Sequence, residues 1–144
     1  MRSVSASSTI HAPIGRVWAI LADLSRYPEW SPFVVAVEGR AAVGETLTLV
    51  VAMTPGRSPI RQRETIRRWD EGREIVWGTV LAHPLVLRAE RYQRLTAIGE
   101  RETRYETADV FEGLLVPVVL GLYGARIQLG FDATAAALKA RAES

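Results

Sequence analysis

The sequence contains no cysteine and no asparagine among its 144 residues. The missing cysteine excludes disulfide bonds, thiolate metal ligands and a cysteine nucleophile, and it favours a reducing compartment. The missing asparagine excludes an N-glycosylation acceptor. No apolar run approaches the ~20 residues of a membrane-spanning helix, and the first residues lack the apolar core of a secretion signal. We therefore expect a cytoplasmic protein.

Lysine is almost as scarce, because Lys139 is the single lysine among the 18 basic residues, and the formal net charge is only +2. So small a net charge gives little whole-molecule attraction to a polyanion. Five arginines are nevertheless concentrated in one stretch, namely Arg57, Arg61, Arg63, Arg67 and Arg68. This run is typical of a solvated strand face, and the alternative is a contact surface for a protein partner. Aromatic residues do not interleave it, so we expect no nucleic-acid partner.

Motifs for metal, phosphate and nucleophilic chemistry are missing too. No His-Glu-x-x-His motif, Gly-x-Ser-x-Gly motif or phosphate-binding glycine loop occurs. We therefore expect no metal and no other cofactor. Of the two histidines, His11 lies at the end of a predicted strand, whereas His83 lies near the strands that would line a cavity. His83 is the better candidate for a general base.

The hydrophobic pattern predicts a single α+β domain over residues 1–144. Apolar residues at helical spacing follow Pro13 and include Trp18, which we expect to be buried; Pro28 and Pro32 stop this short helix. From residue 33 to residue 111 the period changes to two, which indicates strands. Hairpin-like breaks between the strands favour an antiparallel meander. The expected strands are 3–11, 33–37, 45–53, 60–69, 74–82, 85–97 and 103–111.

The last segment, from about residue 116 to residue 142, predicts a long helix with two adjoining apolar stripes. One stripe contains Leu122 and Leu129, and the other contains Tyr123 and Phe131. A seven-stranded sheet curls as it twists, so that, wrapped round this helix, it could leave an apolar space. Three glycines interrupt the helix, at Gly121, Gly124 and Gly130. They either allow close packing against the sheet or help to open a pocket.

Polar side chains interrupt the apolar faces of two neighbouring strands. Arg91 and Gln93 stand in the alternating row between Leu85 and Leu95, and Asp109 interrupts the equivalent row of the last strand. A hairpin across residues 98–102 would set Arg91 near Asp109. An unpaired charge in an apolar interior is unfavourable, so we expect the two to form a charge-assisted pair. Such a pair either fixes the strand register or anchors the polar group of a ligand.

Two passages resemble a known family. The first, from Val17 to Pro32, follows the pattern Val-Trp-x-x-Leu-x-Asp and then Tyr-Pro-x-Trp-x-Pro. The second, from Asp109 to Leu115, resembles the acid-x-Phe-x-Gly-Leu-Leu passage of that family into its last helix. The chain is thereby similar to the START-like / Bet v 1-like superfamily, in its polyketide cyclase/dehydrase and lipid-transport (SRPBCC) group. The resemblance implies a helix-grip fold, in which a curved seven-stranded antiparallel sheet wraps around a long C-terminal helix, with a short helix after the first strand.

The resemblance also implies a cavity between the sheet and the last helix. Its occupant would be a small hydrophobic molecule, such as a lipid, a quinone or a polyketide. We expect apolar walls from Leu47, Leu49, Met53, Leu87, Phe111, Leu122 and Leu129. We expect the ligand to be oriented by Trp77, Arg91, Gln93, Tyr105, Asp109 and Tyr123.

Three classes of function stay open. The first is binding or transport of such a ligand. The second is a polyketide cyclase or dehydratase-type enzyme in the same cavity, in which Asp109 or His83 would move a proton and Arg91 would stabilise an enolate. The family often has histidine where this chain has Arg91, and glutamate where it has Asp109. The third is a partner-binding module that uses the Arg-rich strand, and both a monomer and a homodimer are open.

Overall fold

The computed structural model describes residues 2–144, which form seven strands, two α-helices and one short 3-10 helix. Each strand boundary lies within two residues of its prediction. The helices are α1 (Ile14–Leu21), η1 (Leu24–Glu29) and α2 (Val116–Glu143). The strands are β1 (Arg2–Ile10), β2 (Val34–Glu38), β3 (Thr46–Val51), β4 (Ile60–Asp70), β5 (Glu74–Leu81), β6 (Leu87–Gly99) and β7 (Glu102–Glu112).

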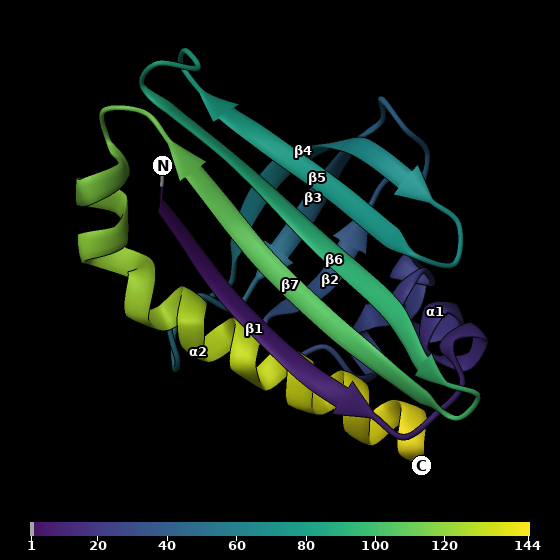
Figure 1. Cartoon of the computed structure of the whole chain (residues 1–144). Helices are drawn as coiled ribbons and strands as arrows, with labels where there is room; N and C mark the ends of the chain where they lie inside the picture. The colour runs from purple at the N-terminus through teal and green to yellow at the C-terminus, as the bar shows by residue number, and fades with distance from the viewer. Residues whose placement is uncertain (1) are drawn as a thin grey trace.

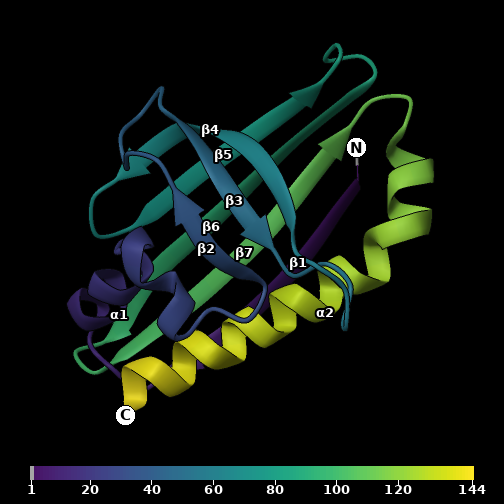
Figure 2. The same cartoon turned by 180° about the vertical axis from the view of Figure 1, so that it is seen from behind.

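The strands form one antiparallel sheet in the order β1-β7-β6-β5-β4-β3-β2. Consecutive strands from β2 to β7 are neighbours, and β1 closes the series by pairing with β7. The sheet curls, and α2 runs along its open side, while α1 lies beside the C-terminal end of α2 (Figures 1 and 2). The predicted α+β, helix-grip architecture is therefore confirmed.

The first helix is shorter than the sequence indicated. It ends at Leu21, and Leu24–Glu29, which contains Tyr27 and Pro28, forms the separate helix η1. The hydroxyl of the buried Tyr27 donates to the carbonyl of Leu21 at 2.7 Å, which satisfies a carbonyl left free at the end of α1. The prediction for Trp18 is confirmed, since its side chain is buried and its Nε1 donates to the carboxylate of Glu71 at 2.8 Å.

The connection between β7 and α2 requires glycine. Gly113 has a φ of 118°, and a Cβ at this position would lie 2.5 Å from the carbonyl oxygen of Val86. Two hydrogen bonds of 3.0 Å join this connection to the β5–β6 turn, from the Leu114 amide to Leu85 and from the Leu115 amide to Val86. The start of α2 is thus held against the end of the sheet at which β6 begins.

Helix α2 turns one of its two apolar stripes inward. Phe131 on the inner stripe is buried and meets Phe33 edge-on, with ring centroids 5.9 Å apart. Leu122 and Leu129 are 66% and 69% exposed, so the expectation that they line the cavity is wrong. The reason is the close approach of α2 to Phe33 at Gly130, where a Cβ would overlap the Phe33 ring. This contact determines which side of the helix faces the sheet.

The other two glycines of α2 have no such packing role. A Cβ on Gly121 would meet nothing within 4 Å, and one on Gly124 would meet only Leu120 of the same helix. The helix changes direction after its first turns (Figures 1 and 2).

Within residues 2–144, no helix combines the length and the apolar character needed to cross a membrane.

Candidate ligand-binding site

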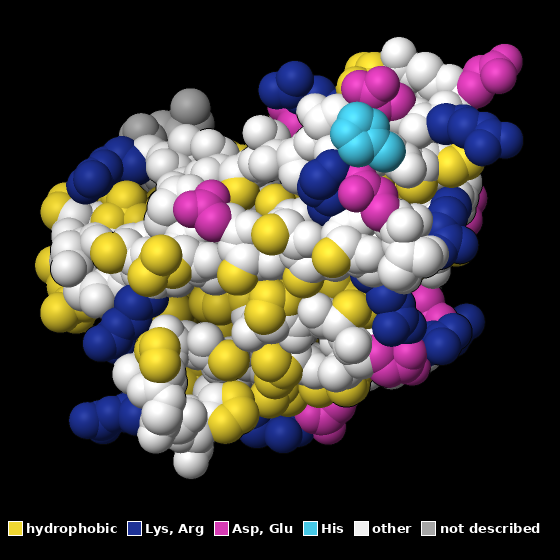
Figure 3. All heavy atoms as spheres, turned by 90° about the horizontal axis from the view of Figure 1, so that it is seen from below, with side chains coloured by type: hydrophobic (Ala, Val, Ile, Leu, Met, Phe, Trp, Pro, Cys, Tyr) yellow, Lys and Arg dark blue, Asp and Glu magenta, His cyan; other side chains and the backbone are white. Residues whose placement is uncertain are grey.

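A cavity of about 360 Å³ lies between the curled sheet and α2. Figure 3, which views the molecule from below, shows hydrophobic side chains gathered in a hollow on this face. Six of the apolar side chains that line it are Leu49, Met53, Leu87, Phe111, Ile127 and Phe131. The cavity implied by the family resemblance is therefore present, and its size falls at the lower end of the ~300–1,000 Å³ range of small-molecule sites.

Polar residues enter this cavity in one row across the sheet. Trp77 on β5 pairs with Arg91 on β6, and Arg91 pairs with Asp109 on β7. The predicted opposition of Arg91 and Asp109 is thus confirmed. Glu64 on β4 also lines the cavity, and both Glu64 and Arg91 are buried, at 8% and 5% exposure. An arginine and two carboxyl groups therefore share an otherwise mainly apolar space.

The expected charge-assisted contact between Arg91 and Asp109 is absent among the described residues. Instead Nε of Arg91 donates to Oγ1 of Thr107 at 3.1 Å, and its Cζ lies 4.2 Å from the centre of the Phe131 ring. The guanidinium is directed to these two partners and not to the carboxylate opposite. Six buried side-chain polar atoms in residues 2–144 have no hydrogen-bond partner, and three of them belong to residues that line the cavity, namely Trp77 Nε1, Arg91 Nη2 and Asp109 Oδ1.

The pKa values of the two carboxyl groups in the cavity are raised. Burial, with a further contribution from the Asp109 charge, raises the pKa of Glu64 to about 8, although Arg91 opposes the rise. Burial likewise raises the pKa of Asp109 to about 6, again against the effect of Arg91. Near neutral pH, Asp109 is therefore mostly ionised while Glu64 mostly carries a proton.

Three residues expected at the cavity lie behind it in the core. Gln93 and Tyr105 are buried, and the Tyr105 hydroxyl donates to Oε1 of Gln93 at 2.7 Å. Leu47 is fully buried. None of the three belongs to the cavity lining. The expectation that they line the cavity is wrong, because the period-two pattern identifies the inner face of a strand but not how far along it the cavity extends.

Of two further residues expected at the cavity, Tyr123 lines it and His83 does not. His83 is exposed in the β5–β6 turn, where its Nδ1 accepts a hydrogen bond from the Leu85 amide at 3.1 Å, and it does not line the cavity. It therefore lies outside the cavity, because the turn carries it beyond the end of the sheet, and its role as a general base stays a prediction. Tyr123 lines the cavity from α2 and is 41% exposed, which places it at the rim.

Glu64 is the residue that sequence reasoning missed. It lies within the Arg-rich stretch and was not among the residues expected at the cavity, although the alternation of β4 carried a usable signal. Glu64 and the buried Ile66 share the inner face of the strand, whereas Arg61 and Arg63 are exposed on the other face. Arg61 also forms an ion pair with Glu38 of β2.

The rim of the cavity is joined across its two sides. Nη1 of Arg126 on α2 donates to Oγ1 of Thr54 in the β3–β4 loop at 2.6 Å. Thr54 itself lines the cavity. This contact holds the loop against the helix at the place where Tyr123 reaches the surface.

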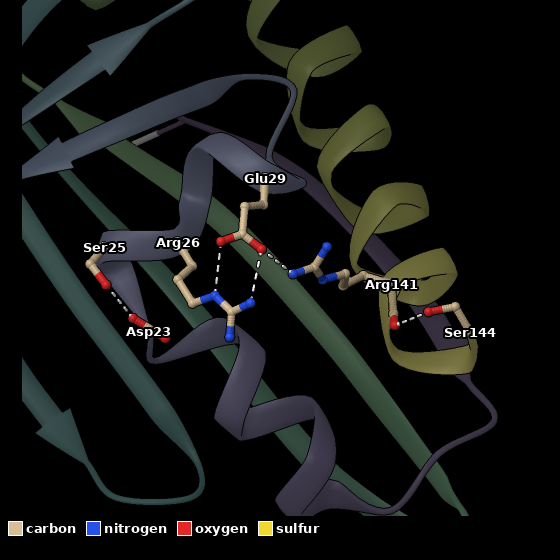
Figure 4. A network of polar contacts seen from close by, with 6 residues as sticks. All are labelled: Asp23, Ser25, Arg26, Glu29, Arg141 and Ser144. Carbon is tan, nitrogen blue, oxygen red and sulfur yellow. Dashed lines mark hydrogen bonds and ion pairs between the residues drawn. The ribbon is translucent and has the colours of Figure 1, made fainter.

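A second hollow, of about 520 Å³, lies near the C-terminal end of α2, and most of its polar side chains already have partners, the exception being the buried Nε1 of Trp30. Glu29 of η1 accepts hydrogen bonds from Arg26 at 2.9 Å and from Arg141 at 2.6 Å, as Figure 4 shows. These contacts hold the pKa of Glu29 at about 2. Nε of Arg16 donates to the carbonyl of Ala142 at 2.6 Å. This hollow therefore anchors the end of α2 and offers a ligand few free groups.

The arrangement of acidic and histidine side chains offers no metal site in residues 2–144, since no three of them are grouped as ligands. The chemistry of the cavity is that of an apolar container with hydrogen-bonding and proton-holding groups in one wall. Trp77 and Arg91 supply donors, and Asp109 supplies an acceptor.

Comparisons with known proteins agree with this architecture. No curated protein matches the chain. The Zhui aromatase/cyclase from a Streptomyces species is 22% identical with a TM-score of 0.73, over 99% of this chain and 93% of that one. A START superfamily protein from Mycobacterium smegmatis is 20% identical with a TM-score of 0.71, over 98% and 97%. Norcoclaurine synthase from Thalictrum flavum is 14% identical with a TM-score of 0.72, over 98% and 93%.

These similarities show the fold alone, because the sequence identities are low. The family is shown by a sequence model, described as polyketide cyclase / dehydrase and lipid transport, which matches residues 1–143. The chain therefore belongs to the polyketide cyclase/dehydrase and lipid-transport family.

Proposed function

We propose that the chain binds a small hydrophobic molecule, with a lipid-like, quinone-like or aromatic body, in the cavity between the sheet and α2. The observation that carries this proposal is the set of three unpartnered polar atoms, Trp77 Nε1, Arg91 Nη2 and Asp109 Oδ1, in a mainly apolar cavity. A buried polar group without a partner is costly to the folded state. A bound molecule that supplies the missing hydrogen bonds removes that cost and buries its own apolar surface.

The site is prepared for such a ligand before the ligand arrives. The guanidinium of Arg91 is held in place by its hydrogen bond to Thr107 and its contact with the Phe131 ring. Trp77 is 1% exposed and has little freedom to move. Little side-chain freedom is therefore lost on binding, which favours affinity.

A polyketide cyclase or dehydratase-type activity is the second candidate, and the two buried carboxyl groups favour it. Their pKa values, about 8 for Glu64 and about 6 for Asp109, lie on either side of neutrality. Such a pair provides one group that holds a proton and one that accepts a proton near neutral pH. Arg91, between them in the cavity wall, would stabilise the negative oxygen of an enolate.

The partner-binding use of the Arg-rich strand has no observation in its favour. Its five arginines are all exposed, and Arg61 is already paired with Glu38. A cytoplasmic location, a single domain over the chain and a monomeric or homodimeric state remain parts of the proposal.

Filling the cavity tests ligand binding. The uncharged ketone 2-acetylnaphthalene serves as the probe, and its binding is measured by isothermal titration calorimetry. Ala89→Phe adds a ring to the cavity lining and should weaken binding at least about tenfold, or 1.4 kcal/mol. The matched control is Ala136→Phe on the exposed face of α2, which should bind as the unchanged protein does.

Equal affinity in both variants, with their circular dichroism unchanged, would contradict the proposed location of the site.

Native mass spectrometry of the protein purified from its own host separates the two candidate functions. An intact hydrophobic molecule that copurifies favours carriage, whereas conversion of an added polyketide-like substrate, lost in Asp109→Asn, favours the enzyme.

A further inference from the structure

We propose that Glu64 and Asp109 act as alternative counter-ions of Arg91, and that the cavity therefore selects molecules with an uncharged ketone or hydroxyl head over carboxylates. This inference rests on the proposed function, because it concerns the ligand of the same cavity. It assigns to Glu64 the role of a specificity-determining residue.

Arg91 on its own would favour an anionic ligand. A buried guanidinium in an apolar cavity is a natural partner for a carboxylate, to which it can donate two parallel hydrogen bonds. Arg91 is 5% exposed and keeps Nη2 free. Without further charged groups, this cavity would therefore hold fatty-acid-like anions.

Two carboxyl groups share the cavity with the Arg91 guanidinium. Asp109 stands opposite Arg91 in the strand register, and Glu64 lines the same cavity from β4. Helix α2 contributes no acid or base to the lining except the phenol of Tyr123. The nearby phenols of Tyr27 and Tyr105 are buried, and burial raises the pKa of each, so both stay neutral. One cation therefore faces two carboxyl groups.

The net charge of these groups decides which ligand head the cavity accepts. The Glu64 pKa of about 8 and the Asp109 pKa of about 6 leave the site with one positive and one negative charge near pH 7. A bound carboxylate would add a second negative charge in a low-dielectric space, so its binding must be accompanied by uptake of a proton. A ketone requires no proton, because its oxygen accepts hydrogen bonds from Trp77 Nε1 and Arg91 Nη2.

The two carboxyl groups are redundant in this role. The Asp109 charge contributes to the high pKa of Glu64, and Arg91 opposes it. If Asp109 is replaced by asparagine, the pKa of Glu64 falls, because burial alone then raises it while Arg91 still lowers it, and Glu64 is then the carboxyl group that can ionise beside Arg91. Only removal of both carboxyl groups leaves Arg91 without an anion, and only then does a carboxylate ligand become the favoured occupant.

A matched pair of probes tests this selectivity. The probes 2-acetylnaphthalene and 2-naphthoate share their ring system and differ in whether a methyl group or a charged oxygen completes the head. At pH 7 the unchanged protein, Asp109→Asn and Glu64→Gln should each bind the ketone at least about tenfold more tightly than the carboxylate. The double variant Glu64→Gln/Asp109→Asn should reverse this preference. The control Glu112→Gln, at the exposed end of β7, should keep it.

The pH dependence of the unchanged protein gives a second measurement that needs no variant to fold. Affinity for 2-naphthoate should increase as pH falls from 8 to 6, by up to about tenfold per unit when one proton is taken up. Affinity for 2-acetylnaphthalene should stay nearly constant. Equal affinities for the two probes, or a pH-independent affinity for 2-naphthoate, would overturn the inference and leave the proposed function standing. Failure of both probes to bind would overturn both.

Discussion

Glu64 should make the stability of the protein fall as pH rises. Burial and the Asp109 charge raise its pKa from 4.5 to about 8 in the folded state. Between these two values the folded chain holds a proton that the unfolded chain has released. The stabilisation linked to Glu64 is therefore fully present below a pH of about 4.5 and is lost as the pH rises through about 8.

The size of the effect follows from the difference between the two pKa values. One pKa unit corresponds to about 1.4 kcal/mol, so the rise from 4.5 to about 8 corresponds to at most about 5 kcal/mol. Of this, about 3 to 4 kcal/mol should be lost between pH 5 and pH 8. The amide of Glu64→Gln has a similar shape and does not titrate. The unchanged protein should therefore lose that much more unfolding free energy over this range than the variant does.

Urea unfolding followed by tryptophan fluorescence at pH 5, 6, 7 and 8 measures this difference. Asp109, whose pKa is raised to about 6, adds a change of the same sign to both proteins, so the comparison isolates Glu64. The control Glu112→Gln removes an exposed carboxyl group and should leave the pH dependence unchanged. Parallel curves for Glu64→Gln and the unchanged protein would refute the reasoning, because they would show that Glu64 is not buried as a neutral acid.

Three further predictions concern packing and the surface. Trp18→Ala should lower the unfolding free energy by about 3 to 5 kcal/mol in urea titration, because this buried ring also loses its hydrogen bond. Reversing the charges of Arg61 and Arg63 should change stability by less than about 1 kcal/mol, since both side chains are exposed, and a pull-down in which a specific partner is lost would contradict the solvated-face interpretation. Gly130→Ala should destabilise by about 1 to 3 kcal/mol because its Cβ meets a buried ring, whereas Gly121→Ala, which meets nothing, should be neutral or stabilising. A similar melting temperature for the two alanine variants would show that α2 does not approach the sheet as described.

The sequence by itself determined the order and type of the elements. Alternation over residues 33–111 identifies half-buried strands because successive side chains of a strand point to opposite faces. The same reasoning set Arg91 opposite Asp109, since a short hairpin leaves few registers and a slip of one strand by one residue would put the two charges on opposite faces of the sheet. Family resemblance, on the motifs around Trp18 and Phe111, identified the fold and the cavity.

Only the tertiary structure decided which stripe of α2 faces inward and how Arg91 is oriented. Helical spacing identifies two adjoining stripes but not their partner, and the contact of Phe131 with Phe33 across Gly130 makes that choice. The Arg91 guanidinium turns to Thr107 and Phe131 because side-chain torsions respond to neighbours from distant parts of the chain. For the same reason the sequence did not reveal the raised pKa of Glu64, which depends on burial and on the charge of Asp109, three strands away in the sheet. Patterns of polarity are local and determine elements, whereas charge and burial at a site depend on contacts that exist only after the chain has folded.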